Sequence, residues 1–276
     1  MRSRLQTFVR QRSALVGALV TGVVVLLAVL APLLTPFQPL RGTGVGLEPP
    51  GAMHLLGTDD LGHDVLAQVL YGARVSITVG LISSVIAFCI GLLIGAPAGY
   101  FGGFIDDALM RFTEFFQVIP RIFLAILLVA LFGQNLVVTV IAIGVLSWPA
   151  SARVLRAEVL SKREAEYVSA ARAAGARAPR LIVRHILPNA IAPLVVTASL
   201  NVGAAILLEA GLAFLGLSDP NQVSLGRTLQ SAIPLIQVAW WVSVFPGLTI
   251  AVLVVAVNLL GDGVNDLLDP RRRALP

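Results

Sequence analysis

The side chains that most often do chemistry are few in this sequence and scattered along it. Its three histidines, His54, His63 and His185, show none of the spacings that place ligands around a metal ion. The acidic pairs Asp59–Asp60 and Asp106–Asp107 are sequence neighbours, so a helix would not place both carboxyl groups on one face. Neither a G-x-S-x-G nucleophile motif nor a G-x-x-x-x-G-K-[ST] phosphate loop occurs. The sequence therefore predicts no catalytic residue, no metal site, no cofactor and no enzyme activity.

A basic, alanine-rich segment is the most distinctive polar stretch of the chain. Ser161 and Glu164 have the spacing of a capping box, which predicts the start of a helix. Gly175 stands where a residue in the left-handed conformation would end that helix. Pro179 suits the first turn of a second short helix, before Pro188 turns the chain into the next apolar run. The segment thus predicts helix, turn, helix, with small residues that another protein could approach closely.

The residues alone leave other interpretations of this basic segment open. A solvated connector without a partner is as well supported by the pattern as a docking element. Binding of anionic lipid through the basic cluster is a further alternative. A nucleic-acid site is disfavoured, because no aromatic residues interleave with the basic ones and membrane topology explains the formal net charge of +5.

The composition explains why such a segment must protrude. Hydrophobic residues make up 57% of the 276 and charged residues only 13%, against roughly a quarter charged in soluble domains. The apolar residues are gathered into charge-free runs, each reaching the roughly 20 residues that cross a bilayer as a helix. These runs cover residues 13–40, 75–105, 122–152, 186–208 and 228–261. We therefore expect an all-α integral membrane protein.

The number of crossings follows from the distribution of charge. Five helices would place the basic segment outside the cell, against the positive-inside bias. Dividing the third run at the turn-like cluster 133–135 gives six helices, the third of which begins near Asp107. Arg111 and Glu114 would share a face of that third helix, and a place in the cytoplasmic headgroup layer is favoured over a translocation role. With six helices only three basic residues face outward, namely Arg41, Arg74 and Arg227.

Six helices divide the chain into a membrane core, two outward loops and two cytoplasmic tails. The basic N-terminus with its apolar run is interpreted as a retained first helix rather than a cleaved signal. Thr58 is expected to cap a short surface helix, and Cys89 to be an inert packing residue. The Trp240–Trp241 pair is expected in the interfacial belt. The predicted bounds are a tail at 1–13, a first helix at 14–35, an outward loop at 36–73, a core at 74–262 that contains the basic loop 154–189 and the outward loop 213–239, and a tail at 263–276.

Two motifs carry a family resemblance. The basic segment has two alanines, three residues and a glycine, and it ends in I-L-P. It resembles the E-A-A…G…I-x-L-P loop of ABC importer permeases, with Ser169 in place of the glutamate and Glu166 a turn earlier. The coupling residues that this resemblance implies are Glu166, Ser169, Ala170, Ala171, Gly175, Ile186, Leu187 and Pro188.

The second motif lies in the first outward loop. It resembles the G-T-D-x-x-G-R-D signature of the dipeptide and oligopeptide branch of these permeases, with His63 where arginine is usual. Its residues are Gly57, Thr58, Asp59, Gly62, His63 and Asp64. The stretches 214–217 and 258–263 resemble later motifs of the same branch, so the resemblance extends over nearly the whole chain.

The resemblance implies a C-type permease subunit of an ATP-driven importer of di- and oligopeptides in the cell membrane, with both termini cytoplasmic. It implies six helices and a helix-turn-helix coupling loop between the fourth and fifth. Expected partners are a second, homologous permease, two cytoplasmic ATPases and an external binding protein. Import of nickel or another small solute, and a stand-alone ion-driven transporter, are the alternatives. Glu209, at the end of the fifth helix, is the one strong acidic candidate for the pathway, although the outer interface is favoured.

Overall fold

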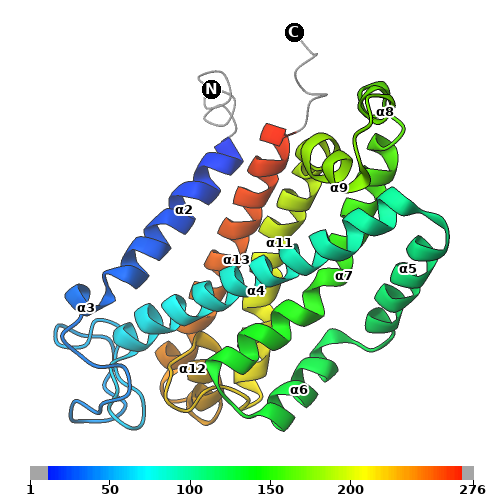
Figure 1. Cartoon of the computed structure of the whole chain (residues 1–276). Coiled ribbons are helices and arrows are strands. Elements are labelled where there is room, and N and C mark those ends of the chain that lie inside the picture. Colours follow the sequence, from blue (N-terminus) through cyan, green and yellow to red (C-terminus); the bar gives the residue numbers. More distant parts are fainter. Residues whose placement is uncertain (1–11, 269–276) are drawn as a thin grey trace.

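The computed structural model describes residues 12–268, which form helices, turns and one isolated β-bridge. Five long helices pack into a bundle (Figure 1): α2 (Arg12–Val29), α4 (Val65–Phe101), α7 (Leu136–Lys162), α11 (Ala192–Phe214) and α13 (Trp240–Leu268). Two short helices, α8 (Glu166–Ala173) and α9 (Ala178–Arg180), lie at one end of the bundle, here called the α8 end. The helices α3 (Ala31–Leu34) and α12 (Leu225–Ala232) lie with the long loop at the other end, called the loop end.

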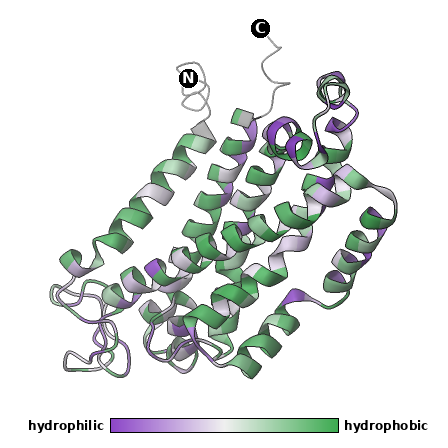
Figure 2. Ribbon diagram, in the orientation of Figure 1, coloured by the Kyte–Doolittle hydropathy of each residue, from purple (hydrophilic) through white to green (hydrophobic). Residues whose placement is uncertain are grey.

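Hydropathy follows the same division. Hydrophobic residues run along the bundle, and hydrophilic residues gather at both ends (Figure 2). Within the described residues, α4, α7, α11 and α13 are each long and apolar enough to cross a membrane. The apolar part of α2, Ala14–Val29, is shorter. By length and composition these helices make four spans, so the predicted count of six stays a prediction.

A bent pair of helices accounts for a possible fifth span. The helices α5 (Gly103–Val118) and α6 (Arg121–Phe132) meet at an angle of 82°. Only when taken together are they long and apolar enough to cross a membrane. The bend has a local cause, because Pro120 cannot continue the helical hydrogen bonding and disfavours helical geometry at the residue before it. Ile119 is accordingly extended, at φ −93° and ψ 131°. The third helix expected from the sequence is therefore broken in two.

The helices α4 and α7 form the closest contact in the bundle. Three glycines of α4, one turn apart, face α7, and a Cβ at Gly95 would lie only 2.4 Å from the backbone oxygen of Ala152. Gly91 and Gly99 are equally confined, by Ser151 and by the backbone of Arg156. Since no side chain separates them, the two backbones touch over several turns. We therefore regard α4 and α7 as one rigid unit.

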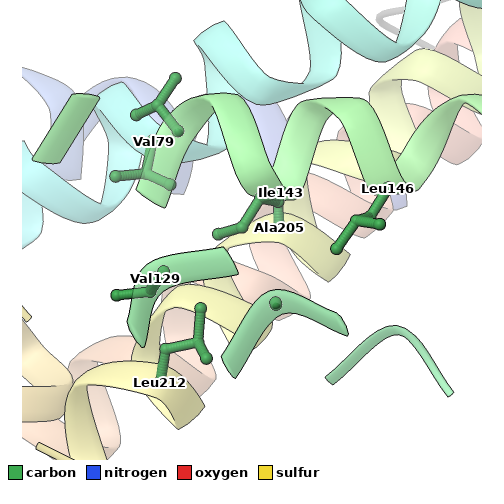
Figure 3. Packing of buried hydrophobic residues seen from close by; sticks show 8 residues of the cluster. Val79, Val129, Ile143, Leu146, Ala205 and Leu212 are labelled. Carbon is green, nitrogen blue, oxygen red and sulfur yellow. The ribbon is translucent and has the colours of Figure 1, made fainter. Parts of the chain in front are cut away.

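An apolar cluster joins this unit to α6 and α11 in the half of the bundle nearer the loop end. Figure 3 shows its side chains converging from four helices. Each of them is buried, so burial of apolar surface holds the short helix α6 against the bundle. The cluster consists of Val79 from α4, Ala125 and Val129 from α6, Val140, Ile143 and Leu146 from α7, and Ala205 and Leu212 from α11.

Several boundaries differ from those predicted. The turn at 133–135 is confirmed, since α6 ends at Phe132 and the Asn135 side chain caps α7. In contrast, α4 begins at Val65, inside the predicted loop 36–73, and α7 continues to Lys162, inside the predicted loop 154–189. The helix α13 runs to Leu268, so it includes the start of the predicted tail 263–276. The remainder of that tail and residues 1–11 lie outside the described residues.

Two single-residue expectations were wrong in an instructive way. Cys89 is exposed on the side of α4 and does not pack in the interior. Trp240 is 52% exposed, as an interfacial residue should be, but its neighbour Trp241 is buried. The Trp241 indole N–H donates to the backbone oxygen of Thr58 at 3.0 Å. Trp241 therefore attaches the long loop to α13 instead of facing lipid.

Candidate functional site

The basic segment between α7 and α11 begins differently from the sequence expectation. Ser161 lies inside α7, so it cannot cap a new helix, and the predicted capping box is wrong. Instead α8 follows a short turn and has Ala165, in extended geometry, as its N-cap residue. The Glu164 carboxylate accepts a hydrogen bond from Arg163 Nε at 3.0 Å.

The end of α8 agrees with the sequence expectation. Gly175 has φ +86°, in the left-handed region that residues with a Cβ rarely adopt. Its N–H donates to the Arg172 oxygen at 3.0 Å, and the Ala176 N–H donates to the Ala171 oxygen at 3.1 Å. These two bonds are those of the Schellman motif, which satisfies the last carbonyls of a helix. The turn geometry of α8 thus depends on glycine at 175.

The second half of the segment is helical as well. Pro179 lies in the first turn of α9, as the sequence predicts. A π-helical stretch, Leu181–Ile186, follows, and then the short α10 (Leu187–Ala190), with Pro188 in its first turn. Helical geometry is continuous from α9 through α10, so the missing N–H of Pro188 interrupts the hydrogen bonding of this helical stretch.

Buried side chains attach the segment to the bundle. Val168 of α8 has no exposed surface, and it belongs to one cluster with Leu155 and Val159 of α7. Leu181 and Ile186 complete the contact from the π-helical stretch. Full burial of a valine or leucine contributes about 1.5–3 kcal/mol. The cluster therefore fixes α8 to the rigid unit of α4 and α7.

The opposite face of α8 is open to solvent and carries both large and small side chains. Exposed there are Glu166, Tyr167, Ser169, Ala170 and Arg172, whereas Ala171 is half-buried against the cluster below. Of the two motif alanines, only Ala170 is therefore fully exposed. Ile186 is buried and Pro188 exposed, so the ending of the motif serves mainly to anchor the segment.

Polar contacts at the base of the segment had no signal in the sequence. Asp106 of α5 accepts from Arg156 of α7 through both carboxylate oxygens, from Nε and from Nη2, each at 2.5 Å. Arg163 Nη1 donates to the backbone oxygens of Gly99 and Tyr100, both at 3.4 Å. These bonds tie α5 and the end of α4 to α7 beneath α8. Asp106 and Arg156 are 50 positions apart, and no local sequence pattern links residues at that separation.

The second sequence motif, residues 57–64 of the long loop, forms hydrogen bonds within the loop and to α4. The Asp59 carboxylate accepts from the backbone N–H groups of Leu61 and His63 and from the Gln68 amide, and it lies 2.8 Å from His63 Nδ1. His63, at the position where the resembling signature has arginine, thus pairs with this aspartate. Asp59 therefore binds the loop together and holds it to α4.

The cap of α4 corrects a further expectation. Asp64 caps α4 by accepting from the Ala67 N–H at 2.7 Å, and its other oxygen lies 2.8 Å from His54 Nδ1. Thr58 caps no helix, because its buried hydroxyl accepts from the Glu48 N–H and donates to the Val45 oxygen. The predicted surface helix is therefore absent from the described loop. Gly57 and Gly62 have φ +79° and +74° in the turns that bring these groups together.

Glu209 is buried inside the protein near the loop end of α11, and its expected place at the outer interface stays a prediction. It is 3% exposed on α11, one turn and a half before the helix ends. The hydroxyl of Ser76, on α4, donates to Glu209 Oε2 at 3.0 Å. The two residues are 133 apart in sequence, so nothing in the pattern could have paired them.

The fold and these contacts define a multi-pass membrane protein with a polar segment mounted rigidly at one end of its helices. Residues 91–274 match the family of binding-protein-dependent transport system inner membrane components, and residues 1–50 match the N-terminal transmembrane domain of oligopeptide transport permease C. The chain belongs to this family of inner membrane transport components. It is therefore a multi-pass inner membrane protein and a permease component of ABC importers, which work with ATPases and binding proteins.

Two similar sequences carry names of peptide transport permeases, and one solved structure has a similar fold. A putative peptide transport system permease protein of Brucella suis is 43% identical over 95% of this chain and 89% of its own length. The di/tripeptide transport system permease protein of Pseudomonas aeruginosa is 41% identical over 96% and 90%. Among solved structures, a chain of the inward-facing methionine ABC transporter MetNI matches with a TM-score of 0.58, covering 73% of this chain and 96% of that one. At 19% identity this last likeness concerns the fold alone.

Proposed function

We propose that this chain is one of two permease subunits of an ATP-driven importer of di- and oligopeptides, and that α8 couples it to an ATPase. The observation that carries the proposal is the arrangement of α8, which exposes Ala170 on a glycine-terminated helix while Val168 is buried in the bundle. Pressure on that face would be transmitted to α7 and α4 through the buried cluster that holds α8. The named peptide permeases among its relatives support the peptide substrate.

The proposed orientation puts the α8 end in the cytoplasm. Among the described residues, the basic groups at the loop end are Arg41, Arg74 and Arg227. Those in and beside the basic segment are twice as many, namely Lys162, Arg163, Arg172, Arg177, Arg180 and Arg184. A cytoplasmic excess of Lys and Arg is the usual bias of membrane proteins. Under this orientation the long loop and α12 face outward, where a binding protein would deliver substrate.

The partners that we propose are a second, homologous permease, which completes the pathway, and two cytoplasmic ATPases. Six crossings of this chain, with α2 as the first and the bent pair α5–α6 as the third, would return both ends to the cytoplasm. We propose no hydrolytic activity for the chain itself, because its sequence contains no phosphate-binding loop.

Reconstitution with all proposed partners tests this function. Proteoliposomes with the binding protein outside and ATP inside should accumulate a labelled dipeptide. Ala170→Glu, which adds bulk and charge to the exposed face of α8, should abolish co-purification of the ATPases, while the equally exposed Ser161→Glu on α7 should not. Uptake without ATPases would favour an ion-driven transporter, and uptake of nickel but not of dipeptide would favour a metal importer. Normal ATPase recruitment by Ala170→Glu would refute the role of α8.

A further inference from the structure

A cavity with a mixed polar and apolar lining opens at the loop end, which is the opposite end of the bundle from α8. Its volume is about 310 Å³, and it lies between α4, the start of α7 and the chain that joins α11 to α12. Small-molecule sites of proteins begin at about this size. The polar groups in its wall are Tyr71, Arg74 and Thr78 of α4, and Asn221 and Gln222 of the joining chain.

Glu209 lies directly behind this cavity. A second cavity of about 10 Å³, with room for about one water molecule, is lined by Glu209 and Ser224. The two cavities are neighbours, because both are lined by Val75, Leu136 and Gln222.

Glu209 has a hydroxyl donor but no cation beside it. Ser76 donates to one carboxyl oxygen, and no described Lys, Arg or His lies within 4.0 Å of either oxygen. A carboxyl group buried in a membrane span without a cationic partner is costly, and such groups commonly mark the path of a substrate or an ion. The structure thus leaves a buried carboxyl group without a cationic partner close to the larger cavity.

The chain that covers the cavity is held in place by specific bonds. Asp219 accepts from the Leu136 N–H at 3.3 Å, which joins it to the start of α7. Arg227 Nη1 donates to three backbone oxygens, of Asp219 at 3.3 Å, Pro220 at 2.6 Å and Gln222 at 3.0 Å. On the inner side the apolar cluster closes the way, since its members Val79 and Ala205 lie one turn deeper than Ser76 and Glu209. The space beside Glu209 therefore does not continue toward the α8 end.

We propose that this cavity is a substrate subsite for a solute with a protonated amine, and that Glu209 receives the ammonium group. Arg74 and the amides of Asn221 and Gln222, at the wall of the larger space, suit a carboxylate or carbonyl group of the same solute. The identity of that solute as a peptide rests on the proposed function. The existence of a cation-selective subsite does not.

Charged thiol reagents test the subsite without any transport. A thiol is introduced by Gln222→Cys in a Cys89→Ser background, within the assembled transporter, and is labelled from the loop side with methanethiosulfonates. The quantity measured is the labelling rate with the cationic ethyltrimethylammonium reagent divided by the rate with the anionic ethylsulfonate reagent. This ratio should be about tenfold higher with Glu209 present than after Glu209→Gln. The matched control Asp60→Asn removes an exposed acidic group of the loop and should leave the preference intact. An unchanged preference after Glu209→Gln, or a thiol that cannot be reached, overturns the proposal.

A second measurement needs no change at Glu209 and so does not depend on that variant folding. Alanylalanine amide, a cation, should slow labelling of the introduced thiol, whereas N-acetylalanylalanine, an anion of similar size, should not. Equal protection by both compounds, or protection by neither, contradicts the proposal. Dipeptide uptake is measured separately at saturating binding protein, where Glu209→Gln should lower the maximum rate at least tenfold. Absence of dipeptide uptake by the unaltered transporter would reject the proposed function, while the labelling results would still decide whether the subsite exists.

Discussion

The ion pair between Asp106 and Arg156 decides how firmly α5 is attached to the bundle. Asp106 and Thr113 are the buried residues of α5, whereas Phe104 and Phe115 are exposed. The ring contacts of Phe112 and Phe116 with Trp148 of α7 lie farther along the helix, so the ion pair is a main attachment of its first turns. We predict that Asp106→Asn will loosen α5 and lower the transport achieved per ATP hydrolysed.

The size of the effect follows from the geometry. Two opposite charges about 4 Å apart attract by about 4 kcal/mol at an effective dielectric constant of about 20. The Asp106 side chain is 11% exposed but that of Arg156 is 34% exposed, so water screens part of this attraction. Desolvation of the carboxylate opposes it further. We expect a coupling free energy of about 1–3 kcal/mol between the two residues.

A double-mutant cycle measures this coupling. The unfolding free energies of Asp106→Asn, Arg156→Gln and the double variant are compared with the parent in the purified transporter, and Arg111→Gln serves as an exposed cation control on α5. The double variant should be less destabilised than the sum of the single ones. Additivity within about 0.5 kcal/mol would show that the two side chains do not interact, and would refute the reasoning.

Three further predictions concern the segment and the loop. Gly175→Pro, which cannot adopt φ +86°, should leave membrane insertion normal but uncouple ATP hydrolysis from uptake; normal coupled uptake would contradict the Schellman turn as a functional element. Val168→Ala should weaken the mount of α8 by about 2 kcal/mol and lower uptake with the ATPases still bound, whereas its exposed neighbour Tyr167→Ala should not. Asp59→Asn should destabilise the outward loop by about 2 kcal/mol, seen as faster proteolysis there, and the exposed Asp60→Asn should have no such effect.

Features set by local chemistry could be predicted from the sequence. Long apolar runs located α4, α11 and α13, because a chain that crosses lipid must satisfy its backbone within one helix. The ends of α6 and α8 were also predictable, since Gly133 and Gly175 take positive φ where the helices end. The resemblance to the loop of ABC importer permeases identified the basic segment that contains α8.

Features set by tertiary contacts could not be predicted. Ser161 and Glu164 have the spacing of a helix start, yet α7 continues through Ser161. Leu155 and Val159, six and two residues earlier, belong to the buried cluster that also contains Val168 of α8. The partners of Asp106 and Glu209 are 50 and 133 residues away, and no local pattern records such pairs. The sequence placed these groups near the ends of predicted helices but left their partners unknown.

The two proposed sites are linked through one helix pair. The helix α4 carries Ser76 at the loop end, and its glycines lie against α7 at the α8 end. Because Gly95 leaves no space for a side chain, α4 cannot slide along α7 without a clash. A displacement of α8, fixed to α7 by Val168, must therefore move α4 as well, and with it the hydroxyl that Ser76 presents to Glu209 on α11. Movement of α4 relative to α11 changes the surroundings of the Glu209 carboxyl, which is the group proposed to bind the ammonium of the solute. We therefore expect force applied at the α8 end to alter the affinity at the loop end through the packing of α4 against α7 and α11.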